Sequence, residues 1–284
     1  MLASGDVTSA AAEWGETIAL AVLQGVTEFL PISSSGHLDA WKRLTGSKLQ
    51  GDLSLDVILH FATLLAVLLV YRKDVVRLLG GIVRGGPARR ELLLVGVGTI
   101  PAGLVGLFAK DSIEGLSGQL PFLLPICWGL CGVALLTSRR RMTAASADPA
   151  PGEAPQFGVR EALWIGMWQM VALLPGVSRS GITIVAALWV GVDREHAARY
   201  SFLIAAPLIA GATALEARDL FSEEGLASAP AILASGFAVA FFVGLGALAL
   251  LLRMLRGGRL HLWGYYLIAI AIGFSAVIAL SDVR

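Results

Sequence analysis

Six long apolar runs are the feature that most constrains the fold of this chain. They cover roughly residues 55–71, 91–109, 120–137, 200–216, 230–252 and 260–280. A helix needs about 20 apolar residues to cross about 30 Å of hydrocarbon, and no run alternates with the period of two that a transmembrane barrel requires. Because 56% of the 284 residues are hydrophobic and only 15% are charged, a soluble globule could not cover its apolar surface. We therefore predict an all-α polytopic membrane protein.

Two further apolar regions do not have the pattern of simple spans. Residues 16–44 and 160–192 are each interrupted near the middle by Pro, Gly and Ser. Cytoplasmic loops collect Lys and Arg, and the six runs alternate if the loops with "YRKDVVR", "SRRRM" and "RMLRGGR" lie inside. Both ends of 16–44 then lie outside, and both ends of 160–192 lie inside. We predict two re-entrant helix–loop–helix hairpins and six transmembrane helices, although two short spans per region would give the same crossing count.

A segment rich in Arg, Pro and Ala, residues 139–158, divides the chain. Its composition is typical of a flexible linker, and its arginines predict that it is cytoplasmic. We expect one membrane repeat in residues 1–138, including the hairpin 16–44. A second repeat is expected in residues 159–284, including the hairpin 160–192.

The two interrupted regions resemble each other in sequence. In "LQGVTEFLPISSSGH" and "WQMVALLPGVSRSGIT", Gln24 corresponds to Gln169, and the Ser-x-Ser-Gly sequences that begin at Ser33 and Ser178 lie at the same separation. The charge pattern places the two copies on opposite sides of the membrane. We therefore predict an inverted repeat, in which two broken helices meet near the midplane and form one site.

The first interrupted region predicts a polar cavity within the membrane. Gln24 and Glu28 are four residues apart and so project from one face of a helix. A carboxylate at this depth costs about 2.5–3.5 kcal/mol on insertion scales. Pro31 then ends the helix, and serines 33–35 followed by Gly36 form a loop rich in hydroxyl and N–H groups. Non-helical backbone at membrane depth requires protein or a water-filled cavity around it.

The second interrupted region has the residues of a phosphate or oxyanion site. Arg179 is a planar, permanently charged group that can bind two phosphate oxygens at once, and Ser178 and Ser180 flank it. Thr183 is expected in the first turn of the next helix, where free N–H groups and the helix dipole favour an anion.

Carboxylate, amide and imidazole groups of the first region would face this anion site. Glu28 and Gln24 offer hard oxygen ligands, which suit Mg²⁺ or Ca²⁺ held together with a substrate phosphate. His37 is the one histidine in either loop and could act as base, acid or nucleophile.

Each of these residues also has a structural interpretation. Glu28 and Arg179 could form a buried ion pair that only joins the hairpins, and Gln24 could hydrogen-bond between helices. His37 could be a cap or an interfacial residue, and His60, at the outer start of a run, is expected to be interfacial or packed. The serines could simply cap helices (Ser33, Ser35 and Ser180).

In these two loops the chain resembles the bacterial undecaprenyl-pyrophosphate phosphatase family, also called the bacitracin-resistance family. Its first motif, Glu or Gln and then Glu four residues later, falls on Gln24 and Glu28, where many members carry a second Glu at the first position. The family's histidine falls on His37, and its proposed nucleophilic serine on Ser34. The second motif, Pro-Gly-x-Ser-Arg-Ser-x-x-Thr, is complete as Pro175, Gly176, Ser178, Arg179, Ser180 and Thr183.

Residue chemistry and resemblance together define a candidate site. The candidate catalytic residues are Glu28, Ser34, His37 and Arg179; the candidate substrate-binding residues are Gln24, Ser33, Ser178, Ser180 and Thr183; the candidate metal ligands are Gln24 and Glu28. The nucleophile could be Ser34, His37 or a water activated by His37.

The resemblance implies hydrolysis of undecaprenyl diphosphate to the monophosphate carrier used for peptidoglycan and other envelope polymers. It places the protein in the bacterial plasma membrane, with a polyprenyl diphosphate and membrane lipids as partners and a homodimer left open. The loop charges place the cavity on the periplasmic or extracellular side.

A net charge of +1 gives no reason to expect nucleic acid as a partner, and the acidic N-terminus gives no reason to expect a cleavable signal peptide. The alternative function is a lipid-phosphate flippase or ion-coupled transporter, because such proteins also use inverted repeats.

Overall fold

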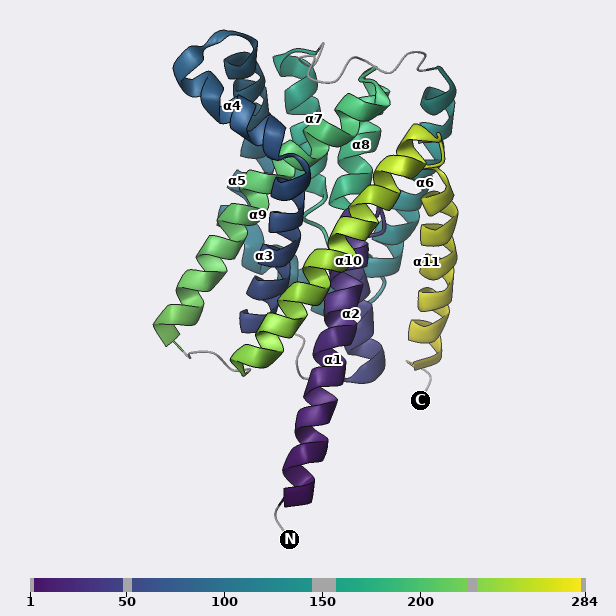
Figure 1. The fold of residues 1–284 in the computed structure, drawn as a ribbon. Helices are drawn as coiled ribbons and strands as arrows, with labels where there is room; N and C mark the ends of the chain where they lie inside the picture. The colour runs from purple at the N-terminus through teal and green to yellow at the C-terminus, as the bar shows by residue number, and fades with distance from the viewer. Residues whose placement is uncertain (1–2, 48–52, 145–156, 224–228, 282–284) are drawn as a thin grey trace.

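The computed structural model describes residues 3–47, 53–144, 157–223 and 229–281, and in these ranges all regular structure is α-helical. The helices are α1 (Ala3–Phe29), α2 (Ser34–Thr45), α3 (Leu53–Val70), α4 (Arg72–Arg84), α5 (Gly86–Gln119), α6 (Leu123–Ala144), α7 (Val159–Val171), α8 (Arg179–Trp189), α9 (Arg194–Glu223), α10 (Pro230–Arg256) and α11 (Leu262–Ser281). The predicted all-α class is confirmed (Figure 1).

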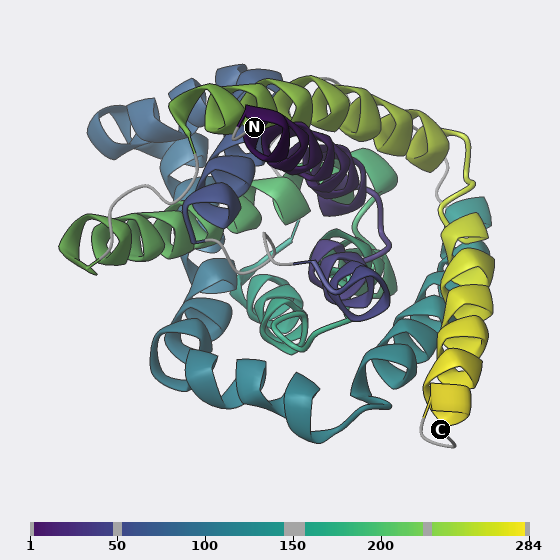
Figure 2. The ribbon, with the colours of Figure 1, turned by 90° about the horizontal axis from the view of Figure 1, so that it is seen from below.

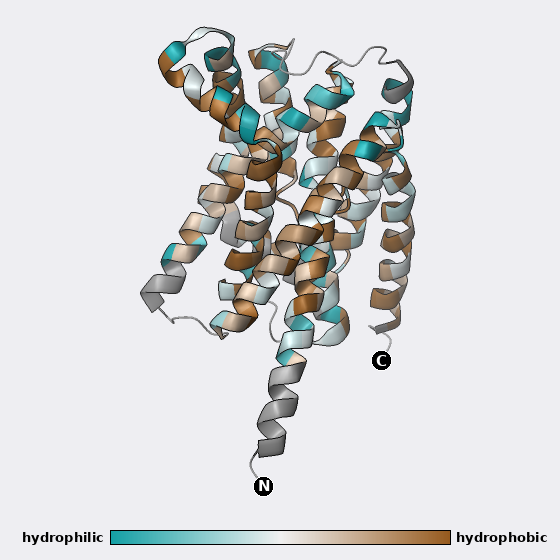
Figure 3. Cartoon of the chain, in the orientation of Figure 1, coloured by the Kyte–Doolittle hydropathy of each residue, from teal (hydrophilic) through white to brown (hydrophobic). Residues whose placement is uncertain are grey.

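Five helices are long and apolar enough to cross a membrane, namely α3, α5, α9, α10 and α11, and they contain five of the six predicted runs. The remaining run, 120–137, forms most of α6, whose uncharged part ends where Arg139 begins an arginine triplet. Hydrophobic residues colour the middle of most helices, and hydrophilic residues gather toward the upper ends in Figure 3. The chain is thus a multi-pass membrane protein.

Each predicted interrupted region forms two helices separated by a break. The first break follows Phe29 and ends at Ser34, and the second follows Val171 and ends at Arg179. In Figure 1 the pair α1–α2 occupies the lower half of the molecule and the pair α7–α8 the upper half. Viewed from below, longer helices surround the short ones, with α5, α6, α10 and α11 outside (Figure 2). The two breaks therefore lie inside the helical assembly.

Glycines allow three helix pairs to pack with their backbones in contact. A Cβ added to Gly166 of α7 would lie 2.6 Å from the carbonyl oxygen of Gly98 in α5. Between α6 and α11 the contact is reciprocal, because a Cβ on Gly132 would lie 2.9 Å from Gly264 O and one on Gly264 would lie 2.6 Å from Gly132 O. Gly25 plays the same part where α1 packs on α10. Such small residues are what close helix packing in membranes requires.

An ion-pair cluster joins α4, α5 and α9 at the upper end of the molecule. Glu91 is 1% exposed and accepts a hydrogen bond from Arg77 at 2.6 Å and another from Arg199. Asp74 lies 3.5 Å from Arg77 and 3.6 Å from Arg199. The predicted run 91–109 therefore begins at a buried carboxylate. The free-energy cost of burying its charge is offset by its ion pairs with two guanidinium groups.

Both ends of the predicted linker 139–158 are ordered parts of the fold. Helix α6 continues to Ala144, so the first six positions of the expected linker are helical. At the other end Phe157 is buried, with its ring centroid 4.8 Å from that of Tyr200. Residues 145–156 lie outside the described residues. Hydropathy marks where a helix leaves the lipid, but it does not mark where the helix ends.

Candidate active site

The two breaks are in direct contact with each other. Ser180, in the first turn of α8, donates a hydrogen bond from Oγ to Phe29 O at 3.0 Å. A Cβ added to Gly181 would lie 3.0 Å from Pro31 Cβ, and one added to Gly36 would lie 3.1 Å from Gly176 Cα. Residues far apart in sequence are thereby brought together, as the paired Ser-x-Ser-Gly sequences predict.

Hydroxyl groups close both breaks with the same hydrogen bonds. Ser33 Oγ accepts from Gly36 N at 3.2 Å, and Ser178 Oγ accepts from Gly181 N at 3.2 Å. In each copy this serine also lies 3.3 Å, Oγ to Oγ, from the serine two positions later. Ser178 is the N-cap of α8, and Ser33 has a φ of 72°, a left-handed conformation that non-glycine residues seldom adopt. The capping interpretation thus holds for Ser33, and it extends to Ser178.

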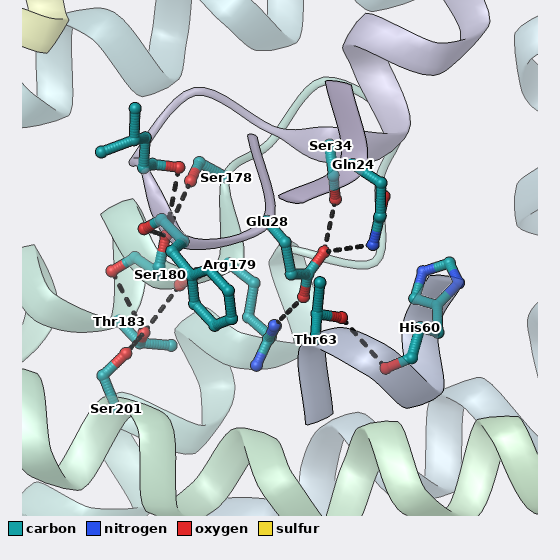
Figure 4. A network of polar contacts seen from close by, with 12 residues as sticks. Gln24, Glu28, Ser34, His60, Thr63, Ser178, Arg179, Ser180, Thr183 and Ser201 are labelled. Carbon is teal, nitrogen blue, oxygen red and sulfur yellow. Dashed lines mark hydrogen bonds and ion pairs between the residues drawn. The ribbon is translucent and has the colours of Figure 1, made fainter. Parts of the chain in front are cut away.

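Glu28 is the centre of the polar network (Figure 4). Its Oε1 accepts a hydrogen bond from Arg179 in an ion pair, and its Oε2 accepts one from Ser34 Oγ at 2.7 Å. Gln24 Nε2 donates to the same Oε2 at 3.3 Å. Four candidate residues from three helices therefore meet at one carboxylate. The ion pair foreseen as the structural alternative exists, and it lies within the candidate site.

A cavity of about 210 Å³ lies against this network. Its polar lining residues are Thr27, Glu28, Ser33, Ser34, Ser35, His60, Ser178, Arg179, Thr213 and Glu216, and the apolar ones are Ala172, Leu173, Val177, Leu208, Ile209 and Ala212. A guanidinium, an imidazole, several hydroxyl groups and two carboxylates thus share one small polar space. Such a space suits a phosphate group, because the cation and the donors can surround its oxygens.

Three candidate binding residues lie behind the cavity wall. Thr183 is fully buried, donates to Arg179 O at 2.6 Å and lies 2.5 Å, Oγ to Oγ, from Ser201. Ser180 uses its hydroxyl on Phe29 O. Gln24 is fully buried beside Glu28. None of the three lines the cavity, so in this structure they support the loops and Glu28 and do not reach the cavity surface.

His37 lies outside the cavity, contrary to what its place in the loop suggests. Its Nδ1 is 2.8 Å from Ser33 O, and its Nε2 is 2.8 Å from the Tyr266 hydroxyl. Its ring stacks on Tyr266 at 5.9 Å and lies 5.3 Å from the Trp128 ring, centroid to centroid. Both ring nitrogens are occupied, so His37 joins α2 to α11 in this structure.

The cavity contains two titratable residues that sequence reasoning did not select. His60, on α3, was expected to be interfacial or packed, and Glu216, on α9, was not singled out. Neither lies in a motif. In the sequence, each is a polar residue within or next to an apolar run. Such a residue can be noticed, but the sequence does not show which side of its helix faces the cavity.

Comparison with known proteins supports the resemblance over most of the chain. Residues 17–273 match the model of the family described as "Bacitracin resistance protein BacA". An undecaprenyl-diphosphatase of Desulfosudis oleivorans is 40% identical over 264 residues, which are 88% of this chain and 93% of that protein. One of Christiangramia forsetii is 36% identical, covering 93% of this chain and 97% of that protein. Undecaprenyl-diphosphatase 4 of Bacillus thuringiensis subsp. konkukian is 36% identical, covering 89% and 93%. The chain therefore belongs to the bacitracin resistance protein BacA family.

Proposed function

We propose that this protein is a membrane phosphatase that hydrolyses undecaprenyl diphosphate to undecaprenyl phosphate and inorganic phosphate, so that the lipid carrier is recycled for peptidoglycan and other envelope polymers. The observation that carries the proposal is the meeting of Glu28, Ser34 and Arg179 at one polar cavity inside the helices. The names of the relatives support the same reaction. No observation favours the flippase or transporter alternative.

Ser34 has the geometry of a nucleophile with its base. Its Oγ donates a hydrogen bond to Glu28 Oε2 at 2.7 Å. The terminal phosphate would bind Arg179 and draw it from Glu28, and a carboxylate that loses a cationic partner becomes a stronger base. Ser34 Oγ then bonds to the terminal phosphorus, its proton passes to Glu28, and the bond from that phosphorus to the bridging oxygen breaks. Undecaprenyl phosphate leaves, and water hydrolyses the phosphoserine to free phosphate.

A divalent cation, Mg²⁺ or Ca²⁺, is proposed beside Glu28. In the described ranges no three His, Cys, Asp or Glu side chains cluster to hold a metal, so the protein alone does not form a complete site. The buried Gln24 Oε1 has no hydrogen-bond partner and is a hard oxygen next to the Glu28 carboxylate. Glu28 lines the cavity and can hold a cation together with substrate phosphates and water, as Mg²⁺ commonly does, whereas Gln24 lies behind the cavity wall and would reach this cation only if its amide turned toward the cavity. When bound, it would neutralise charge on the transferred phosphoryl group.

The polyprenyl tail would remain in the lipid during the reaction. Helices α3 and α9, which contribute to the polar cavity, also wall an apolar groove of about 790 Å³ together with α4 and α5. Its lining includes Leu64, Leu68, Ile100, Leu104 and Leu203. A tail lying along this side of the protein would keep its apolar surface out of water while the diphosphate enters the polar cavity.

We further propose that α1–α2 and α7–α8 are re-entrant hairpins of an inverted repeat. The matching hydrogen bonds of the two breaks and the reciprocal glycine contact between α6 and α11 support this arrangement. The cavity is lined by His60 from the first half of α3 and by residues between 208 and 216 from the second half of α9, and these halves lie toward the lower end in Figure 1. The basic residues of α4, of the last turns of α6 and of the last turn of α10 lie at the opposite end. With these inside, the cavity opens to the periplasmic or extracellular side of the plasma membrane.

The proposed reaction can be tested with the purified protein. We expect detergent-solubilised wild-type protein to release inorganic phosphate continuously from undecaprenyl or farnesyl diphosphate. The matched variant is Ser34→Ala, which removes one oxygen and leaves Glu28 and Arg179 in place; it should lose most of the activity and keep its melting temperature. Binding of the diphosphate by the wild-type protein without release of phosphate would contradict the proposal and favour a carrier.

A further inference from the structure

His60 is held in a fixed orientation at the cavity. Its Nδ1 lies 2.9 Å from Asp56 O, one turn earlier on α3, and Thr63 donates to His60 O at 3.0 Å. The carbonyl oxygen is an acceptor, so Nδ1 carries the proton in this bond. Among the residues that the structure describes, Nε2 has no hydrogen-bond partner. One ring nitrogen therefore orients the imidazole, and the other remains able to bind a ligand.

The surroundings of His60 are those of the phosphate site. It shares the cavity with Glu28, Ser34 and Arg179. Figure 4 places it on α3 beside Gln24 and Glu28. Arg179 approaches Glu28 from α8, whereas His60 belongs to α3, so the two residues come from different walls. A phosphate bound at Arg179 would therefore have an imidazole on a second side.

A comparison with His37 indicates which histidine can contact a ligand in the cavity. Both nitrogens of His37 are engaged, by Ser33 O and the Tyr266 hydroxyl, and it does not line the cavity. His60 lines the cavity and has one nitrogen engaged. Resting on the proposed phosphatase function, we propose that His60 Nε2 is a substrate contact that shares a hydrogen bond with the terminal phosphate of the lipid diphosphate. This hydrogen bond needs a single proton, which either Nε2 or the phosphate oxygen can carry.

Substitutions of His60 separate a phosphate contact from a packing role. His60→Leu removes the hydrogen-bonding nitrogen and should lower kcat/KM by about 10- to 100-fold, as expected for one lost hydrogen bond to a charged group. His60→Gln replaces Nε2 with an amide that can hydrogen-bond at similar reach, and it should recover most of the activity, with the gain mainly in KM. The matched control is His261→Leu, because His261 also bonds through Nδ1 to a carbonyl, Gly258 O at 3.2 Å, but lies outside the cavity; its kinetics should not change.

Chemical labelling tests the contact without relying on a variant that folds. Diethyl pyrocarbonate should modify His60 in the wild-type protein, and saturating inorganic phosphate or farnesyl diphosphate should protect it, as measured by peptide mass spectrometry. His261 should be labelled equally with and without these ligands. Unprotected His60 in a protein that hydrolyses the diphosphate would overturn the proposal for His60 alone, as would full activity of His60→Leu. A wild-type protein without phosphatase activity would instead overturn the proposed function.

Discussion

Glu28 makes a contact that suits each of the two roles that the sequence left as alternatives. It joins α1 to α8 through its ion pair with Arg179, and it accepts from Ser34 the hydrogen bond that the proposed reaction requires. The Arg179 side chain is 16% exposed and lines the cavity, so loss of its partner would not leave a fully desolvated cation. The ion pair is therefore expected to matter less for stability than a fully buried pair, whose disruption costs about 3–5 kcal/mol.

For this reason Glu28→Gln should fold and be inactive. The amide has nearly the same shape and can still hydrogen-bond Ser34, but it accepts no proton and lacks the negative charge for a cation. We expect at least a ~100-fold loss of kcat, in the range of general-base catalysis, with a decrease of only a few degrees in melting temperature. Phosphate release should be measured across a titration of Mg²⁺ and Ca²⁺. Hydrolysis at the parental rate by a folded variant would end the catalytic assignment.

Arg179→Lys tests whether the planar guanidinium is needed. Lysine keeps the charge but offers a single ammonium group, which cannot bind two phosphate oxygens in the bidentate manner of arginine. We expect kcat/KM to fall by about 10- to 100-fold, the cost of one or more charge-assisted hydrogen bonds. Steady-state kinetics on farnesyl diphosphate provide the measurement, with the melting temperature as control. Near-normal turnover would contradict the bidentate role.

Local sequence predicted the loop residues of this site but not the residues around them. Glu28 and Arg179 could be predicted because charged groups in an interrupted apolar region need a polar cavity, whereas the family resemblance was needed to select Ser34 from the three consecutive serines. His60 and Glu216 could not, because each is a single polar residue of a long helix and its direction depends on packing. The position of His37 in the loop predicts that it lies at the site. In the structure its Nε2 contacts the Tyr266 hydroxyl on α11, and the residue does not line the cavity.

At the level of the elements, Pro, Gly and Ser mark the breaks well, whereas hydropathy marks the helix ends poorly. The breaks after Phe29 and Val171 fall within the two predicted regions. Helices α5, α6 and α9 extend beyond their apolar runs into charged segments such as 86–91 and 139–144. Charged residues leave the hydrocarbon, but Arg and Glu are good helix formers, so the helices continue into water.

The glycine contact between α5 and α7 gives a prediction about helix packing. Gly166→Ala would place a Cβ 2.6 Å from Gly98 O, and backbone cannot move aside without separating the helices. We expect a destabilisation of about 1–3 kcal/mol, as for other overpacked sites, measured as a lower melting temperature in detergent. The matched control is Gly103→Ala on α5, where an added Cβ meets nothing within 4 Å; it should be neutral or stabilising. Equal melting temperatures for the two variants would refute the close contact.

For the whole molecule, orientation decides which compartment the cavity faces. The cavity residues His60 and Glu216 lie toward the end where α3 begins and α9 finishes, and the exposed residue Thr45, at the end of α2, lies at that end too. At the other end, Arg89 is exposed in the first turn of α5 and Arg259 is exposed after α10. If the basic end lies inside the cell, Thr45 should lie outside it, and Arg89 and Arg259 should lie in the cytoplasm.

Single cysteines at these positions should label from opposite sides of the membrane. Thr45→Cys should react with a membrane-impermeant thiol reagent added to intact cells, whereas Arg89→Cys and Arg259→Cys should react only after permeabilisation. The native Cys127 and Cys131 are buried and should add little background, which the parental protein measures directly. If the lipid diphosphate is cleaved outside, the phosphate is released into the same compartment in which Thr45→Cys reacts. Labelling of the two arginine positions in intact cells, with Thr45→Cys protected, would reverse the orientation and place the cavity on the cytoplasmic side.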